Sequence, residues 1–416
     1  MSKNIVIVGG GIVGLSTAYF LHKSGHRVTV LEKSDITSGA SFVNAGYITP
    51  SHIIPLAAPG MMSKGLKWMF NSASPFYLKP RWDPEFFKWA WYFKRSSTRA
   101  KVEQAIPVIK NINILSRGLF EDIKSSGDLG DFQLERKGLL MLYKTEKAGE
   151  EEMKVAEKAS FIGLEVKALN KKETQNLEPD IELDIRGAIH YECDGHTTPT
   201  EFMSKMVSYL RKAGVRIHTE EEVISIAVSG NTVENIVTDK GEYKADEVVI
   251  AAGSWTSVLV KNIGLRIPLQ AGKGYRINIE SATGIRYPAV LMETKVAVTP
   301  MKGFTRLAGT MEFSGINHKI RQERVEAIAM AAQGYYPGLE VTAGEKAAAE
   351  SGLRPVSPDG LPYIGRSAKY QNLVMATGHA MMGWSLGPAT GLLIAEIIDG
   401  KKPSMNIEPF SPDRKF

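Results

Sequence analysis

The chain has 416 residues, of which 43% are hydrophobic and 23% charged, a composition typical of a soluble globular protein long enough for two domains. The formal net charge is only +6 and no long Lys/Arg block is present, which argues against nucleic-acid binding. Cys193 is the single cysteine, so an internal disulfide and a thiolate metal cluster are excluded, and we predict no metal site. No apolar run reaches the roughly 18 residues of a membrane span and no signal peptide precedes the first strand, so we expect a cytoplasmic protein.

The chain begins with a predicted strand, a glycine-rich turn, a helix and a second strand. Residues 5–8 are apolar and β-branched, as in a parallel strand that is buried on both faces. Residues 15–24 have the apolar content of a helix packed on a sheet, and residues 27–32 are the second strand. The turn carries a G-x-G-x-x-G motif at Gly9, Gly11 and Gly14. This order predicts a Rossmann-type dinucleotide site.

Each part of this motif suits a bound dinucleotide. Gly9 permits the tight turn, Gly11 lets the backbone approach a pyrophosphate, and Gly14 lets the helix pack closely on the strand. The N-terminus of the helix offers N–H groups and partial positive charge to the phosphates. Glu32, 18 positions after Gly14, is placed to accept hydrogen bonds from the ribose hydroxyls and would repel the extra phosphate of NADP. The motif alone leaves NAD and FAD open.

Two less regular regions follow. Residues 33–59 form a long segment rich in small residues, and such loops are often functional. Residues 61–99 are aromatic and basic, with a helix predicted from Pro84 and four tryptophans, including Trp68 and Trp91. This region is either an insertion packed on the surface or a patch that touches a membrane interface.

The remaining pattern alternates between α/β and mixed β segments. We predict helices over residues 102–124, 148–161, 199–212, 321–335 and 384–398, and a hairpin over 132–143. Strands are predicted over residues 187–192, 215–218, 223–228, 233–238, 243–250, 274–279, 290–300, 304–308 and 372–377. We therefore expect an α/β fold: a discontinuous dinucleotide-binding domain of Rossmann type (1–45, 196–265 and 346–416) and a mixed-sheet α+β substrate-binding domain (46–195 and 266–345).

Two further strand-to-glycine junctions favour FAD over NAD. Residues 248–255 contain an A-A-G turn at Ala252 and Gly253, and residues 373–379 contain an A-T-G-H turn at Gly378 and His379. This pattern is similar to that of flavoproteins with two-dinucleotide-type domains, in which these turns lie near FAD. In those proteins the last helix points its N-terminus at the flavin C2 carbonyl, where negative charge develops on reduction.

With these motifs the chain resembles the glycine oxidase/D-amino-acid dehydrogenase family of flavoproteins, and most of all its D-amino-acid dehydrogenase branch. The S-F-x-N-A-G and K-G-Y pieces point most narrowly to that branch. The segments that carry the resemblance are 5–14 with Glu32, 41–46, 57–60, 272–275, 352–355, 358–362, 378–379 and 383–384.

The resemblance implies non-covalent FAD, because Cys193 does not match the cysteine of the covalent relatives. It implies oxidation of an amino acid to an imino acid, which water converts to a 2-oxo acid and ammonia. Dehydrogenase members pass electrons to a quinone or another respiratory acceptor at the inner face of the membrane, whereas oxidase members use O₂. The residues expected to bind FAD are Gly9, Gly11, Ile12, Val13, Gly14, Glu32, Lys33, Ser38, Ser41, Asn44, Ala45, Gly46, Val223, Ala252, Gly253, Gly378, His379, Met382, Gly383 and Trp384.

Substrate binding is assigned to four residues. Arg354 is expected to grip the carboxylate, because a guanidinium donates two parallel hydrogen bonds. Tyr275 is a candidate for a second carboxylate contact, and His379, beside the flavin, for positioning. His52 is expected at the mouth of the pocket, although the family motif carries other residues there. No obligatory base is expected, because an amine that binds unprotonated needs none.

Three alternatives remain open on the sequence. The first is a sarcosine, glycine, proline or hydroxyproline oxidase or dehydrogenase on the same fold. The second is an NAD enzyme, and the third is a flavoprotein without catalytic activity of its own.

Overall fold

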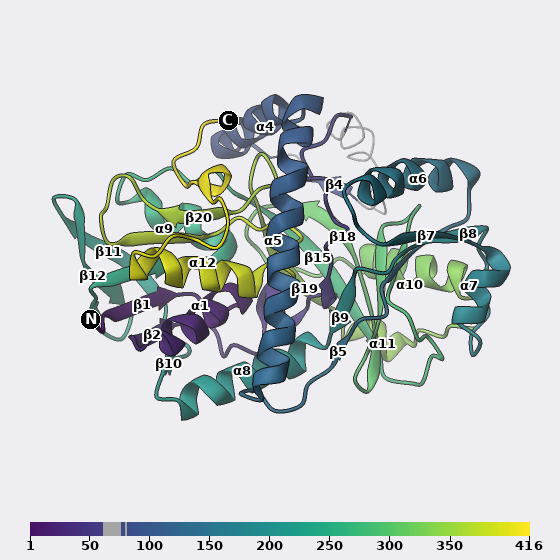
Figure 1. The fold of residues 1–416 in the computed structure, drawn as a ribbon, viewed down its shortest axis with the longest axis horizontal. Coiled ribbons are helices and arrows are strands. Elements are labelled where there is room, and N and C mark those ends of the chain that lie inside the picture. Colours follow the sequence, from purple (N-terminus) through teal and green to yellow (C-terminus); the bar gives the residue numbers. More distant parts are fainter. Residues whose placement is uncertain (61–75, 80) are drawn as a thin grey trace.

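The computed structural model describes residues 1–60, 76–79 and 81–416. Figure 1 shows an elongated molecule whose two parts lie side by side, with the N-terminus at the far left and the long helix α5 (Arg99–Ser126) crossing the middle. Among the described residues, no helix combines the length and apolar character needed to cross a bilayer.

The left part of Figure 1 is built on a six-stranded sheet in the order β10-β2-β1-β14-β21-β20, parallel except for the edge strand β20. Three helices and part of α5 pack on one face, and a small sheet with α9 covers the other. This arrangement confirms the predicted Rossmann-type fold. The strands are β1 (Asn4–Val8), β2 (Arg27–Leu31), β10 (Arg216–His218), β14 (Glu247–Ile250), β20 (Tyr363–Arg366) and β21 (Leu373–Thr377). The covering elements are α1 (Ile12–Lys23), α8 (Pro199–Lys212), α12 (Gly387–Asp399), α9 (Thr256–Lys261), β11 (Val223–Ser229), β12 (Thr232–Thr238) and β13 (Glu242–Lys244).

Close backbone packing explains two glycines of the motif. Gly9 has a φ of +113°, and a Cβ there would lie 2.4 Å from the carbonyl oxygen of Ala251. A Cβ on Gly14 would lie 1.9 Å from the carbonyl oxygen of Gly9. Both residues therefore let the first turn, α1 and β14 pack in direct contact.

The right part of Figure 1 holds a nine-stranded mixed sheet in the order β19-β15-β18-β17-β16-β6-β8-β7, with β4 paired to β18. One face packs on α10, and α6 packs on the other face near β8. Its strands are β4 (Phe76–Leu78), β6 (Leu139–Tyr143), β7 (Val166–Asn170), β8 (Gly187–Tyr191), β15 (Gln270–Ile279), β16 (Ala289–Leu291), β17 (Val296–Met301), β18 (Phe304–Phe313) and β19 (Glu350–Val356). The other elements are α2 (Gly39–Phe42), α4 (Pro84–Ser96), α6 (Glu146–Phe161), α7 (Lys171–Leu177), α10 (Gln322–Tyr335), α11 (Ala343–Ala347) and a third sheet of β3 (Tyr47–Ile48), β9 (Gly195–Thr197) and β5 (Leu134–Glu135).

The strand register separates two rows of side chains on this large sheet. Because successive residues of a strand point to opposite faces, directly paired residues share a face. The row packed on α10 includes Tyr275, Leu307, Val298, Ala289 and Leu140. The opposite row carries Arg354, Gly274, Ala308, Ala297, Val290 and Met141.

The structure corrects some predicted elements. Residues 132–143 do not form a hairpin, because β5 pairs with β9 whereas β6 pairs with β8 and β16. The run 290–300 contains two antiparallel strands, β16 and β17. The last helix begins at Gly387 rather than near Trp384. The division of the chain into two domains at the stated boundaries stays a prediction.

Candidate active site

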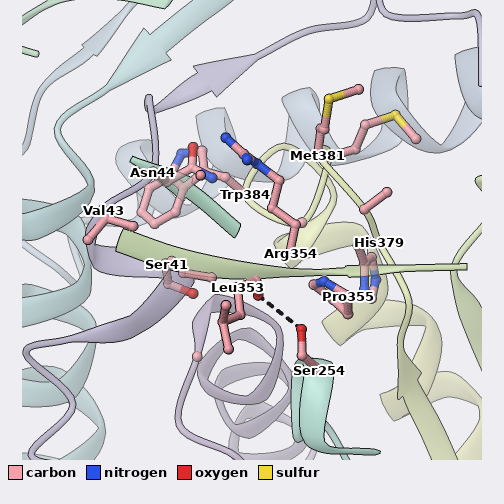
Figure 2. A pocket seen from close by; sticks show the side chains of 18 of the residues that line it. Ser41, Val43, Asn44, Ser254, Leu353, Arg354, Pro355, His379, Met381 and Trp384 are labelled. Atoms are coloured by element: carbon pink, nitrogen blue, oxygen red, sulfur yellow. Dashed lines mark hydrogen bonds between the residues drawn. The ribbon is translucent and has the colours of Figure 1, made fainter. Parts of the chain in front are cut away.

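A single cavity of about 1400 Å³ runs from the turn after β1 to the face of the large sheet that carries Arg354. Its volume exceeds that of a pocket for one small ligand, so it has space for a dinucleotide and a substrate together. Figure 2 shows its central part, with Arg354 on β19 directed into the space between Asn44, Trp384 and Met381.

The end of the cavity beside β1 is lined by the glycine turn and by acidic residues, of which Glu32 contacts the turn directly. Glu32 accepts hydrogen bonds from the backbone N–H of Gly10 at 2.7 Å and from the N–H and hydroxyl of Ser34 at 2.9 Å. At the start of α1, the N–H of Ile12 donates to the Ser41 hydroxyl at 2.9 Å. A fixed carboxylate next to a glycine turn and a helix N-terminus matches what the ribose and pyrophosphate of a dinucleotide require.

Most of the residues predicted to bind the cofactor line this cavity. Gly14, Gly46 and Gly378 do not line it, and each is confined by backbone or core atoms instead. A Cβ on Gly46 would lie 2.2 Å from the Thr197 carbonyl oxygen, and one on Gly378 would lie 2.7 Å from the ring of Tyr363. These three glycines shape the chain around the cavity. Those that line it are Gly9, Gly11, Ile12, Val13, Glu32, Lys33, Ser38, Ser41, Asn44, Ala45, Val223, Ala252, Gly253, His379, Met382, Gly383 and Trp384.

The loop that contains Asn44 and Ala45 is fixed to the large sheet by a buried cation. Arg306 donates to the carbonyl oxygen of Asn44 at 2.7 Å and to that of Phe42 at 2.8 Å, and Thr299 donates to that of Ala45 at 2.8 Å. Burial lowers the pKa of Arg306 to about 9. This loop therefore has a defined place between the two sheets.

Arg354 is a charged side chain with no acidic partner among the described residues. Its Nη1 donates to the carbonyl oxygen of Thr310 at 2.9 Å, and the rest of the guanidinium faces the cavity. A Cβ on Gly274 would lie 2.1 Å from Nη1, so a larger residue there would displace the guanidinium from its present position. Desolvation lowers the pKa of Arg354 to about 10. This is the effect expected for a buried cation in a site that binds an anionic ligand.

Tyr275 borders the cavity, but the structure does not bring its hydroxyl to the side of the sheet that carries Arg354, where a second carboxylate contact was predicted. Its side chain lies on the α10 face of the sheet, opposite Arg354, and its hydroxyl donates to Glu312 at 2.7 Å. Glu312 also lies 3.1 Å from the Nζ of Lys273 and 3.7 Å from Arg324. The period of two along β15 put Gly274, not Tyr275, beside Arg354.

Of the two histidines predicted near the substrate, His379 is buried and His52 is partly buried. His379 lies 2.9 Å from the Thr390 hydroxyl, which itself donates to the carbonyl oxygen of Leu386, so His379 must be the donor. Burial lowers the pKa of His379 to about 3, which keeps the ring neutral. His52 lines the cavity, and burial, with a smaller contribution from Lys295, lowers its pKa.

Four other residues of the cavity were not predicted from the sequence. Ser34 follows Glu32 by two positions, and its hydrogen bonds to that carboxylate are a turn feature the spacing could have indicated. Trp255 ends the A-A-G-S-W run, and the Nζ of Lys33 lies 3.5 Å from the centre of its ring. Thr310 and Met381 line the cavity only because of tertiary contacts.

Comparison with known proteins decides the family. The FAD dependent oxidoreductase family (DAO) matches residues 4–397. The chain belongs to this family. It is an FAD-dependent oxidoreductase, and the glycine turn, Glu32 and the start of α1 fit the cofactor.

Individual proteins agree with this assignment over nearly the whole chain. The chain is 30% identical to a D-amino acid dehydrogenase of Vibrio atlanticus, over 99% of each chain. Its fold is similar to that of a glycine oxidase from Geobacillus kaustophilus, with a TM-score of 0.80, 24% identity, and coverage of 100% of this chain and 99% of the other. An L-proline dehydrogenase from P. horikoshii has a TM-score of 0.76 at 20% identity, with coverage of 99% and 97%.

Proposed function

We propose that this protein oxidises a D-amino acid to its imino acid, which water hydrolyses to a 2-oxo acid and ammonia. The observation that carries this proposal is Arg354, a guanidinium directed into the FAD cavity without an acidic partner among the described residues. A carboxylate is the ligand that such a group binds best, since two parallel hydrogen bonds fix both its position and its orientation. The relative from Vibrio atlanticus supports the D-amino acid as substrate.

The sheet next to Arg354 leaves room for the substrate. Gly274, Ala308 and Ala297, on three neighbouring strands, all line the cavity on this face, although the register pairs Ala308 with Arg276. Their small side chains leave space between this part of the sheet and the cavity. Larger side chains, Val290 and Met141, follow on the next two strands. A carboxylate held by Arg354 therefore has its Cα beside the least crowded part of the sheet.

FAD, when bound, accepts the hydrogen and two electrons from Cα at its N5 atom. Gly11, Ile12 and Val13 would hold the pyrophosphate and Glu32 the ribose. Asn44 and Ala45 would lie at the other end, with the turn 382–384 that precedes α12. We propose that the cofactor is not covalently attached: Cys193 does not line the cavity, and its Sγ lies 3.4 Å from Asp194.

The chain's own residues bind and orient, and we assign none as an obligatory base. His379 donates its Nε2 proton to Thr390 and stays neutral, so it holds the turn after β21. An amine that enters unprotonated needs no base, because its lone pair assists departure of the hydrogen from Cα. Activity should therefore rise with pH as the substrate amine loses its proton.

The test is anaerobic reduction of the flavin. The purified holoprotein is mixed without oxygen with a panel of D- and L-amino acids, and the visible absorbance of the flavin is followed. D-Amino acids should bleach it, and their L-enantiomers should not. Absence of bleaching by every amino acid would contradict the proposal.

A second function on the same fold is supported by the structural neighbours. The glycine oxidase and L-proline dehydrogenase point to glycine, sarcosine, proline or hydroxyproline as alternative substrates. All share a carboxylate next to an amine, so Arg354 would serve any of them. Including these amino acids in the panel, with O₂ and a dye as acceptors, separates an oxidase from a dehydrogenase.

We propose that electrons pass to a quinone or another respiratory acceptor at the inner face of the cell membrane. Helix α4 supports a peripheral contact: Trp89 and Phe93 are buried, whereas Phe87 and Trp91 are 50% and 57% exposed. Trp82, 89% exposed, packs against Phe87, and Lys94 and Arg95 extend the exposed face. Trp68 of the predicted patch lies outside the described residues.

Aromatic and basic side chains on one helical face suit a lipid headgroup region. The protein should therefore sediment with anionic vesicles and be released by salt. A W91E/F87E variant should stay in solution while its activity toward a soluble dye is retained. No sedimentation of the wild-type protein would leave α4 as ordinary surface packing.

A further inference from the structure

Strand β18 contains an irregularity directly next to Arg354. In its pairing with β15, Glu312 lies opposite Lys273, but Tyr275 lies opposite Gly309. Two residues of β18, Thr310 and Met311, therefore face the single residue between Lys273 and Tyr275. This is a β-bulge, a feature that redirects a side chain and is common beside active sites.

The bulge holds Thr310 in an unfavourable conformation. Its φ is +65°, in the left-handed region that a β-branched residue rarely occupies. Glycine would adopt this conformation without strain, so the threonine side chain must be retained for another reason. The bulge also turns the Thr310 carbonyl oxygen toward Nη1 of Arg354, at 2.9 Å.

The hydroxyl of Thr310 has no hydrogen-bond partner among the described residues. Its Oγ1 is buried from solvent, yet Thr310 is one of the residues that line the cavity. An unpaired buried hydroxyl is costly and calls for an explanation. Since carbonyl and hydroxyl belong to the same residue, this free donor lies close to the guanidinium of Arg354.

We propose that Thr310 is a substrate-binding residue whose hydroxyl donates to the carboxylate held by Arg354. One N–H of the guanidinium donates to the Thr310 carbonyl oxygen and thereby fixes the Arg354 side chain. The remaining N–H groups donate to the carboxylate. The hydroxyl then supplies the neutral donor that Tyr275, on the other face of the sheet, does not supply. This inference rests on the proposed function, because it requires an anionic carboxylate ligand at Arg354.

The test uses propionate, a carboxylate without an amine, titrated into the FAD-loaded protein. Binding is followed by the change in the flavin absorption spectrum, so no turnover is needed. Thr310→Val keeps the shape but lacks the donor, and it should bind propionate about tenfold more weakly. Thr310→Ser should bind as the wild type does. Propionamide, which has no charge, should bind neither protein measurably.

Thr310→Gly separates a binding role from a structural one. Glycine relieves the strain at positive φ, so this variant should unfold at a temperature at least as high as the wild type. It should nevertheless lose about tenfold in propionate affinity. Thr305→Val, the same change at a buried threonine of β18 that pairs with Thr283, is the matched control and should leave the affinity unchanged.

Propionate affinity within twofold of wild type in both Thr310→Val and Thr310→Gly would overturn the inference. Failure of the proposed function gives a different result, in which the wild-type protein itself shows no spectral change with propionate and no bleaching with amino acids. If Thr310→Val loses FAD, the comparison of Thr310→Gly with Thr310→Ser decides the question alone.

Discussion

The two ends of the cavity are built from different parts of the peptide chain. At the β1 end the glycine turn, with Gly9 and Gly11, and the carboxylate of Glu32 come from one continuous βαβ segment, and residues 221–224 and 251–254 complete the wall. At the sheet end the walls are side chains from strands more than 200 residues apart, such as Met141 and Arg354. The first end recognises groups that every dinucleotide carries. On the proposed function the second end binds the substrate, so changes there should alter binding of the amino acid while FAD stays bound.

The largest effects should come from the glycines of the β1 end, and they should differ from one another. A Cβ on Gly11 meets only the Ser41 hydroxyl, at 3.2 Å, so Gly11→Val should fold but lose FAD and all activity. A Cβ on Gly14 would lie 1.9 Å from the carbonyl oxygen of Gly9, so Gly14→Val should fail to give folded protein. Circular dichroism and the flavin content of the purified protein measure the two outcomes. A Gly11→Val protein that binds FAD normally would contradict this view of the turn.

Arg354→Ala tests the sheet end. Removing one partner of a desolvated ionic contact typically costs about 3–5 kcal/mol, so kcat/KM for the best amino acid should fall by roughly 10²–10⁴-fold while FAD remains bound. Steady-state kinetics and the flavin spectrum measure both. Arg354→Lys keeps the positive charge but not the two parallel N–H donors of the guanidinium, so its kcat/KM should fall less than that of Arg354→Ala. Near-normal turnover by Arg354→Ala would remove the basis for a carboxylate site here.

His379, in the turn after β21, should make the stability of the protein depend on pH. Its pKa is about 3 in the folded protein against 6.5 for the free side chain, so between these values the unfolded chain binds a proton that the folded protein excludes. The contribution is complete above pH 6.5 and is lost as the pH falls, by about 2 kcal/mol at pH 5. His379→Gln keeps a donor for Thr390 and should lose less stability between pH 7.5 and 5. Denaturant unfolding in excess FAD measures the free energy of unfolding of both proteins at the two pH values. Equal losses in the wild type and in His379→Gln would show that other groups control the pH dependence of stability.

The smallest effect is expected from Tyr275→Phe. Because the hydroxyl donates to Glu312 on the far face of the sheet, its loss should lower the free energy of unfolding by about 1 kcal/mol and leave KM within twofold. Tyr335→Phe, which removes a similar bond to Glu293, is the matched control for stability. A tenfold rise in KM for Tyr275→Phe alone would restore the role that the sequence suggested.

The sequence predictions were accurate for features encoded by neighbouring residues and less accurate for pairing between distant strands. The βαβ unit, the long helices α5, α6, α8 and α10 and the acid at Glu32 depend on local periodicity and glycine placement, and they lie where predicted. The predicted hairpin at 132–143 was wrong because its two strands join different sheets. A local residue pattern does not indicate which strand, distant in the sequence, a segment will pair with.

The sequence by itself determined the cofactor end, since a phosphate-binding turn is made of adjacent residues whose backbone must be free of side chains. It also indicated Arg354, through its resemblance to known flavoproteins. Only the tertiary structure decided which face of the large sheet meets the cavity. That choice depends on the registers of β15, β18 and β19 and on one bulge. It places Tyr275 in the core beneath α10 and Thr310 next to Arg354.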